Sequence, residues 1–268
     1  MAVDFFGNDV MLVPYDDEHF TVTVKVAVNV QFFGWLVGLG GKAKILEPKS
    51  AAEEMRRHLA SMLEPPLGSL LNIYDTILFV DTETTGLDPD KDHITEAAII
   101  KVTTDGKTIR EHFFVQLPEG VSVPEEVSRL TGVTDEMCRS GLTPPEAAKR
   151  LFSLMEGKTL FAAYNVQFDA SFWRALTGDI PADFLDPLTV FRDRHPAPHN
   201  LSAATEFYGT KTKPSHRADD DAQALMEVTM ALSAERDDLR EYVNVIGYKE
   251  KYGISGGRLP GVRYKPQE

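Results

Sequence analysis

Alternating apolar residues mark the first part of the chain. Between residues 20 and 30 every second position is apolar, which predicts a strand with one buried face. These positions are Phe20, Val22, Val24, Val26, Val28 and Val30. An apolar helix over residues 31–40, a short strand over 43–46 and an amphipathic helix from Ser50 follow. We therefore expect a small α+β domain of βαβα order over residues 1–66.

Proline and glycine interrupt this pattern at residues 64–69, Glu-Pro-Pro-Leu-Gly-Ser, where regular structure is disfavoured. We expect the domain boundary here, with a linker over residues 67–74. Strands followed by helices then predict a second domain of the α/β class over residues 75–268. The expected strands are residues 76–83, 94–103, 112–117 and 159–164, and the expected helices are residues 124–130, 144–155, 167–176, 201–208 and 219–232.

Composition narrows the class of protein. The 268 residues are 43% hydrophobic and 26% charged, which is typical of a globular chain with a buried core. The most apolar stretch, residues 26–39, contains Asn29, Gln31 and Gly34 and is too polar to predict a transmembrane helix. The first residues do not resemble a signal peptide, and the single cysteine, Cys138, excludes a disulfide framework. We expect a cytoplasmic protein with no membrane partner.

The charge balance limits how this chain binds nucleic acid. It has 28 Lys and Arg against 41 Asp and Glu, a net charge of -13. This argues against a broad basic surface that binds phosphates by itself. Any chemistry on nucleic acid is therefore expected to be local, with positive charge supplied by metal ions.

The first candidate site is a pair of acids at the end of an apolar strand, in the sequence Ile77-Leu-Phe-Val-Asp81-Thr-Glu83. Residues two apart on a strand share a face, so Asp81 and Glu83 point the same way. Two adjacent carboxylates repel unless a proton or a cation lies between them. The alternative is a solvated strand end, and the buried strand that leads into the pair argues against it.

Helical spacing indicates a third acid, Asp169. Phe172, Trp173 and Leu176 follow it on one stripe, so the carboxylate is expected on a buried face, where an acid needs a partner. The alternative is an acid in the first helical turn, favoured only by the helix dipole.

A fourth acid comes from three consecutive aspartates, Asp219, Asp220 and Asp221. Asp221 begins the most apolar stripe, which continues through Leu225, Val228 and Leu232. His216 precedes the helix and is expected to lie over whatever Asp221 binds, although a lone histidine is also a common surface or packing residue.

Together, Asp81, Glu83, Asp169 and Asp221 are four oxygen donors on three separate elements. Hard oxygen ligands without cysteine select Mg²⁺ or Mn²⁺, and several carboxylates in one place suit a pair of ions. Such a pair of ions supports hydrolysis of a phosphodiester.

The order of these motifs resembles that of the DEDDh 3′-to-5′ exonucleases, which include the proofreading epsilon subunit of DNA polymerase, ribonuclease T and oligoribonuclease. The similarity covers about residues 75–233 and implies a ribonuclease H-like mixed sheet flanked by helices. The matching segments are Asp81-Thr-Glu83-Thr-Thr-Gly86, Asn165-Val-Gln-Phe-Asp169 and His216-x-Ala-x-x-Asp221-Ala-x-x-Leu225, together with Glu96, Leu130-Thr-Gly-Val-Thr134 and Asn200-Leu201.

The resemblance implies that the four acids hold two divalent cations, with Asp81 between them, and that His216 is the general base. It implies a substrate that is the 3′ end of single-stranded nucleic acid, with nucleoside 5′-monophosphate as product. The substrate-binding residues that it implies are Thr82, Thr84, Gly86, Leu87, Glu96, Asn165, Phe168 and His216. We expect DNA as the substrate. The alternatives are an RNA-processing exonuclease of the ribonuclease T or oligoribonuclease kind, and a binding module without catalysis.

Residues 1–65 are similar to the C-terminal extension of bacterial WYL-domain transcription regulators. The similarity lies in Phe6-Gly-Asn-Asp-Val, residues 19–28, Phe33-Gly-Trp-Leu and Ile45-Leu-Glu-Pro48. The DNA-binding helix-turn-helix of those regulators has no counterpart here, so regulator function does not follow. The remaining roles are a packing surface, self-association into a homodimer, or guidance of nucleic acid.

The last segment, residues 241–268, carries five Lys and Arg against three acids, with Tyr248, Tyr252 and Tyr264 interleaved. Basic and aromatic residues on a Gly- and Pro-rich segment suit contact with a single strand. A solvated tail is equally compatible with the sequence.

Overall fold

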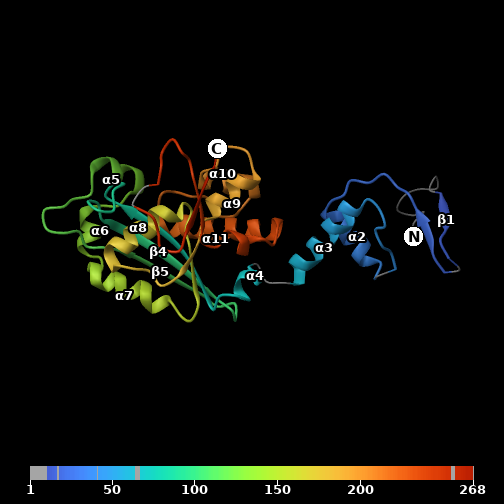
Figure 1. The fold of residues 1–268 in the computed structure, drawn as a ribbon, viewed down its shortest axis with the longest axis horizontal. Helices are drawn as coiled ribbons and strands as arrows, with labels where there is room; N and C mark the ends of the chain where they lie inside the picture. The colour runs from blue at the N-terminus through green and yellow to red at the C-terminus, as the bar shows by residue number, and fades with distance from the viewer. Residues whose placement is uncertain (1–10, 17, 41, 64–66, 255–256, 268) are drawn as a thin grey trace. The chain divides into compact units, whose positions relative to one another are not determined.

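We analysed a computed structural model, which describes residues 11–16, 18–40, 42–63, 67–254 and 257–267. The chain divides into two compact units, Met1–Leu63 and Glu64–Glu268 (Figure 1). In the part of the chain that the structure describes, no helix is both long and apolar enough to span a membrane.

The smaller unit contains two short strands and two helices. Strand β1 (Leu12–Pro14) pairs antiparallel with β2 (Phe20–Val22), and helices α2 (Val30–Gly38) and α3 (Lys49–Leu63) follow. The side chain of Asn29 caps α2 by accepting a hydrogen bond of 3.0 Å from the backbone N–H of Phe32. Both predicted helices are confirmed.

The strand prediction for this unit was wrong in two places. The strand predicted over residues 20–30 ends at Val22, because β1 offers only three residues for pairing. Its apolar positions are not a buried face either, since Phe20 is 54% exposed and Val28 38% exposed. Residues 43–46 are described but form no strand.

The larger unit contains a five-stranded mixed sheet, which confirms the predicted fold class. Its strands are β3 (Thr76–Thr84), β4 (Ile94–Thr103), β5 (Thr108–Phe114), β6 (Thr159–Ala162) and β7 (Asp183–Leu185). In the order β5-β4-β3-β6-β7, the pairs among the first three strands are antiparallel and those that involve β6 are parallel. The strand predicted over residues 112–117 is β5, which begins and ends earlier, because residues 108–114 pair with β4 directly after the turn at Gly106.

Helices cover both faces of this sheet. They are α4 (Gly68–Leu71), α5 (Glu125–Thr131), α6 (Asp135–Arg139), α7 (Pro144–Leu154), α8 (Val166–Thr177), α9 (Pro187–Arg194), α10 (Leu201–Tyr208) and α11 (Ala218–Glu235). The sequence predicted five of them, at α5, α7, α8, α10 and α11. Helices α4, α6 and α9 were not predicted. Helices α4 and α6 have only four and five residues, which is too short for a clear apolar period.

The central strand β3 has a different core on each of its faces. Ile77 and Phe79 pack with Leu225 and other residues of α11. The alternate residues Leu78 and Val80 pack with Trp173 and other residues of α8 and α7. Side chains alternate along a strand, so the odd-numbered residues that follow Phe79 face the layer of α11.

The predicted linker, residues 67–74, is part of the larger unit in the structure. Leu67, Leu70 and Tyr74 are each at most 3% exposed and lie in the core that contains α11. The Tyr74 hydroxyl donates a 2.7 Å hydrogen bond to Asp183 on β7. Burial of these apolar side chains holds the segment against the sheet. The linker was predicted from the proline and glycine residues of 64–69, which do not indicate this burial.

The C-terminal segment also folds back onto the larger unit. After a 3₁₀ turn (Leu239–Tyr242), β8 (Val245–Tyr248) pairs in parallel with β9 (Arg263–Pro266). Leu259, between these strands, is only 2% exposed. The strands of this segment therefore belong to the fold of the larger unit, whereas residues 250–253 between them are exposed.

Candidate active site and metal centre

Strand β3 carries Asp81 and Glu83 from the core to the end of the sheet. The four residues before Asp81 are fully buried, and both acids lie on the face that packs against α11. Glu83 is directly opposite Glu96 of β4 in the antiparallel register. Residues opposite each other share a face and lie close together, so three acids meet at this end of the sheet.

Helix α11 brings Asp221 to the same place. Asp221 is 8% exposed, whereas Asp219 and Asp220 are exposed, as the apolar stripe through Leu225 predicts. The backbone N–H of Ser215 donates a 2.8 Å hydrogen bond to the Asp221 carboxylate and fixes its direction. One carboxylate oxygen each of Asp81, Glu83 and Asp221 lies within 4.8 Å of the other two. We call these three residues the acidic cluster.

Asp169 reaches the acidic cluster from the other side of β3. Strand β6 ends at Ala162, opposite Phe79, so the last residues of β3 have no strand beside them there. The chain turns at Asn165, which has a left-handed backbone (φ 77°), and enters α8. Asp169, 4% exposed, accepts a hydrogen bond from the Thr82 side chain and lies close enough to Asp81 to raise the pKa of that carboxyl. Asp169 is not one of the three residues whose carboxylate oxygens lie within 4.8 Å of one another.

Burial and mutual repulsion raise the pKa values of these acids. Burial, and then the charges of Asp169, Asp221 and Glu83, hold the pKa of Asp81 well above its usual range. Burial, with the charges of Asp221 and Glu96, raises the pKa of Glu83 to about 7, although the nearby Arg217 lowers it. Such a group of carboxylates is stable only with bound protons or cations. Its donors are all oxygen atoms, which fits a divalent metal ion of the Mg²⁺ class.

Glu96 is paired with two side chains that the sequence did not indicate. Its fully buried carboxylate accepts hydrogen bonds from Arg217 at 2.7 and 3.0 Å and lies 2.6 Å from Nε2 of His112. Glu96, His112 and Asp219 also have the spacing of a metal site. The guanidinium of Arg217 already supplies positive charge to the same Glu96 oxygen, so we interpret this group as an ion-pair network.

Arg217 was missed because its partner lies 121 residues away in the sequence. Its only local signal is its position directly after His216. His112 gave no signal at all, since it lies on a partly exposed strand where a histidine is unremarkable.

His216 lies immediately before the helix that carries Asp221. It is exposed and has a left-handed backbone (φ 59°). Its charge and its backbone N–H both act to lower the pKa of Asp221, against the larger effect of burial, which raises it. His216 is therefore beside the acidic cluster, with its ring accessible to solvent.

The other residues predicted to bind substrate differ in exposure. Leu87 is 79% exposed, and Phe168 is half-buried with its ring 4.9 Å from that of Phe172. The Thr84 hydroxyl donates to the carbonyl of Gly86. The side chain of Thr82 is buried and accepts a 3.1 Å hydrogen bond from the Trp173 indole. Thr82 thus supports Asp169, and only its main chain is available for the predicted substrate contact.

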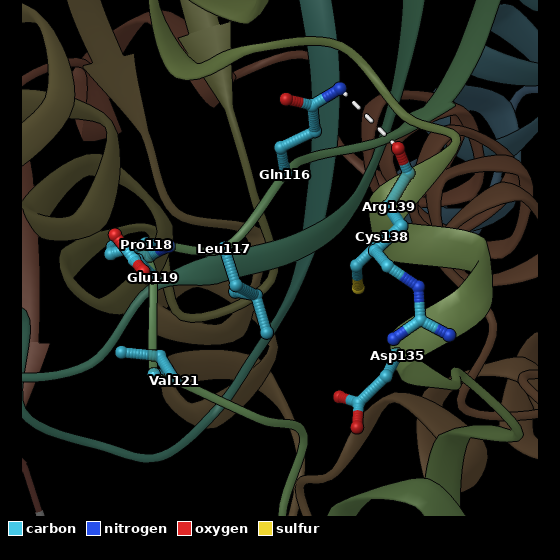
Figure 2. A pocket seen from close by; sticks show the side chains of 9 residues that line it. Gln116, Leu117, Pro118, Glu119, Val121, Asp135, Cys138 and Arg139 are labelled. Atoms are coloured by element: carbon cyan, nitrogen blue, oxygen red, sulfur yellow. Dashed lines mark hydrogen bonds between the residues drawn. The ribbon is translucent and has the colours of Figure 1, made fainter.

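A cavity of about 290 Å³ lies apart from these acids, between residues 116–121 and α6 (Figure 2). Its lining includes Asp135, Cys138 and Arg139 but none of the predicted site residues. The Cys138 thiol lies 3.8 Å from the carbonyl of Thr95 on β4. Burial raises the pKa of this thiol to about 11, so near neutral pH it is a protonated packing residue and not a nucleophile.

Comparison with protein families gives two matches along the chain. The family model for exonucleases, which is named after ribonuclease T, matches residues 78–229. The model of the WCX domain matches residues 4–63. The second match agrees with the predicted resemblance of the N-terminal region to the extension of WYL regulators.

Individual relatives match about three fifths of the chain. The PolC-type DNA polymerase III of Thermotoga petrophila is 28% identical over 183 residues, which is 64% of this chain but 13% of that protein. The epsilon subunit of DNA polymerase III of Treponema pallidum is 28% identical over 163 residues, 58% of this chain and 74% of that protein. Among solved structures, E. coli exonuclease I in complex with a dA16 oligonucleotide has a TM-score of 0.55 at 22% identity, over 63% of this chain and 42% of that one.

The raised pKa of Glu83 predicts a pH-dependent stability in the absence of metal. Its pKa is about 7 in the folded protein against 4.5 ordinarily, so the stability that its protonation contributes is complete below pH 4.5 and is lost as the pH rises through 7. Glu83→Gln cannot ionise. We expect it to raise the melting temperature at pH 8 in EDTA by about 2–4 °C, or about 1 kcal/mol for a partly solvated group, and the gain to shrink toward pH 5.

Thermal unfolding followed by circular dichroism measures this shift. Glu119→Gln is the matched control, since it removes one negative charge from an exposed position. Equal melting temperatures for Glu83→Gln and Glu119→Gln at pH 8 would contradict the account of the cluster.

Proposed function

Because the chain belongs to the exonuclease family, we propose that its larger unit is a metal-dependent 3′-to-5′ exonuclease. It removes nucleoside 5′-monophosphates one at a time from the 3′ end of a single strand. The observation that carries this proposal is the convergence of Asp81, Glu83 and Asp221 within 4.8 Å at the end of β3. Acids at that spacing, with raised pKa values, are suited to cation binding.

The proposed cofactors are two divalent cations, Mg²⁺ or Mn²⁺. Asp81, Glu83 and Asp221 would hold them together with Asp169, which approaches Asp81 from α8. When bound, such ions stabilise negative charge on the oxygens of the phosphodiester that is cleaved.

The chain's own contribution to the reaction is positioning and proton transfer. An imidazole nitrogen of His216 accepts a proton from the attacking water, a role that histidine commonly takes in catalysis. The water oxygen forms a bond to phosphorus, and the bond from phosphorus to the 3′ oxygen of the preceding nucleotide breaks. The exposed position of His216 beside Asp221 supports this role, because the water and the terminal phosphate both have to enter from solvent.

The terminal nucleotide is proposed to bind along the end of β3. The main chain of Thr82, Thr84 and Gly86 lines this path, and the exposed side chain of Leu87 offers an apolar contact to the base. On the α8 side, Asn165 and Phe168 complete the site, with the Phe168 ring available for stacking. Glu96 is opposite Glu83 on β4. Its proposed action at the sugar would require its fully buried carboxylate to give up one of its present partners, Arg217 or His112.

DNA is the proposed substrate. The support comes from the relatives, which are named as components of DNA polymerase III. Hydrolysis of one sequence supplied both as a DNA strand and as an RNA strand tests the choice. Faster hydrolysis of the RNA strand would identify an RNA-processing enzyme, and hydrolysis of neither would favour a binding module.

Asp221→Asn is expected to abolish hydrolysis with little loss of stability, because it removes one charge from the acidic cluster and keeps its shape. The measurement is metal-dependent shortening of a 5′-labelled DNA strand, with EDTA as the blank. The matched control is Asp220→Asn, whose side chain is exposed and hydrogen bonds to Ser215. Equal rates for Asp221→Asn and the wild type would refute the assignment.

His216→Ala is expected to slow hydrolysis by about 10² to 10⁴, the usual contribution of a general base. Measurement of single-turnover rates between pH 5.5 and pH 8.5 tests this expectation. A variant with the wild-type rate across this range would remove His216 from the role.

A further inference from the structure

The C-terminal segment is attached to the helix that carries Asp169. The hydroxyl of Tyr264 donates a 2.6 Å hydrogen bond to Oε1 of Gln167, in the first turn of α8. The side-chain nitrogen of Gln167 donates a 2.6 Å hydrogen bond to the carbonyl of Gly257. A third hydrogen bond, of 2.7 Å, runs from the backbone N–H of Leu259 to the same Tyr264 hydroxyl. These contacts fix residues 257–264 beside the N-terminus of α8.

This attachment presents the guanidinium of Arg258 at the surface. Arg258 is exposed, and its Cζ atom lies 4.9 Å from the centre of the Tyr264 ring. Among the described residues, no carboxylate forms an ion pair with it at 4 Å or less. Arg174 of α8 adds a second positive charge, since both guanidinium groups act to lower the pKa of Tyr264 against the larger effect of burial.

The geometry of α8 relates the segment that carries Arg258 to Asp169. Successive residues of a helix are about 100° apart, so Gln167 and Asp169 lie on nearly opposite sides of α8 and Phe168 lies between them. The side of α8 that carries Asp169 faces the acidic cluster, and the opposite side, at Gln167, holds the segment that carries Arg258. The half-buried Phe168 lies on the surface of the helix between these two sides. A strand bound at the acidic cluster would reach Arg258 by passing around α8 over Phe168. The helix with its side chains is about 10–12 Å across, and this diameter determines the length of that path.

A strand bound at the acids needs positive charge along such a path. The chain has a net charge of -13, so a polyanion is repelled from most of its surface. Phosphates recur about every 3.4 Å along a stacked strand. A strand that passes around α8 over Phe168 travels about 17–21 Å and therefore reaches Arg258 within about six nucleotides.

We propose that Arg258, held by the hydrogen bonds among Tyr264, Gln167 and Gly257, binds a backbone phosphate of the single strand a few nucleotides before its 3′ end. The inference rests on the proposed function and extends it, because it assigns a strand-binding role to a segment outside residues 78–229, the part that matches the exonuclease family. Arg258 is a binding residue and takes no part in the chemical step.

The test compares a long substrate with one that occupies only the terminal position. The long substrate is a thymidine dodecamer, and the short one is the p-nitrophenyl ester of thymidine 5′-monophosphate. For Arg258→Ala we expect KM for the dodecamer to rise about 3- to 10-fold with kcat unchanged, and both constants for the ester to stay at wild-type values. The slope of log KM against log salt concentration should also fall by about 0.7, the value for one phosphate contact on a single strand.

Two variants control for charge and for fold. Arg258→Lys keeps the charge and should retain most of the affinity. Arg263→Ala removes the same charge from an exposed residue of β9 whose side chain points away from that of Tyr264, and it should behave as the wild type.

Each other outcome overturns the inference. Wild-type KM and salt slope for Arg258→Ala on the dodecamer would show that no phosphate binds there. An equal loss on the dodecamer and the ester would show that the substitution disturbs the acids themselves. If the unaltered protein hydrolyses neither substrate, the proposed function fails, and this inference fails with it.

Discussion

Repulsion among buried carboxylates is the constraint on which the rest of the structure depends. Asp81, Glu83 and Asp221 bring oxygens within 4.8 Å of one another at the end of a strand whose preceding residues are fully buried. Burial and mutual repulsion raise the pKa values of these acids. Repulsion among these carboxylates lowers the stability of the metal-free protein, and bound cations would relieve it. The arrangement is therefore explained if the site binds cations. The fold around it can be understood as the means of holding these acids together.

Three features of the larger unit keep the acids in place. Helix α11 is anchored by an apolar stripe, so Asp221 cannot turn away without exposing Leu225 and Val228. Strand β6 stops short of the end of β3, which leaves room for the first turn of α8 and Asp169. The pair between Glu96 and Arg217 ties the segment before α11 to β4, and this segment carries His216.

Much of this arrangement could be predicted from the sequence, because local periodicity determines it. Alternation along β3 placed Asp81 and Glu83 on one face, and the apolar stripe of α11 selected Asp221 from three consecutive aspartates. What could not be predicted depends on contacts between distant residues. The pairing of Glu96 with Arg217 spans 121 positions, and the attachment of Tyr264 to Gln167 spans 97. The strand expected over residues 20–30 failed for a related reason, since alternation does not show whether a pairing partner exists.

The central claim, that these carboxylates form a binding site for paired divalent ions, is tested most directly by calorimetric titration of Mn²⁺ into metal-free protein. The account predicts saturable binding of about two ions per chain, and loss of at least one of them in Asp81→Asn while circular dichroism shows an intact fold. A folded wild-type protein that binds no Mn²⁺ at millimolar concentration, or that binds it equally well after this substitution, would contradict the account.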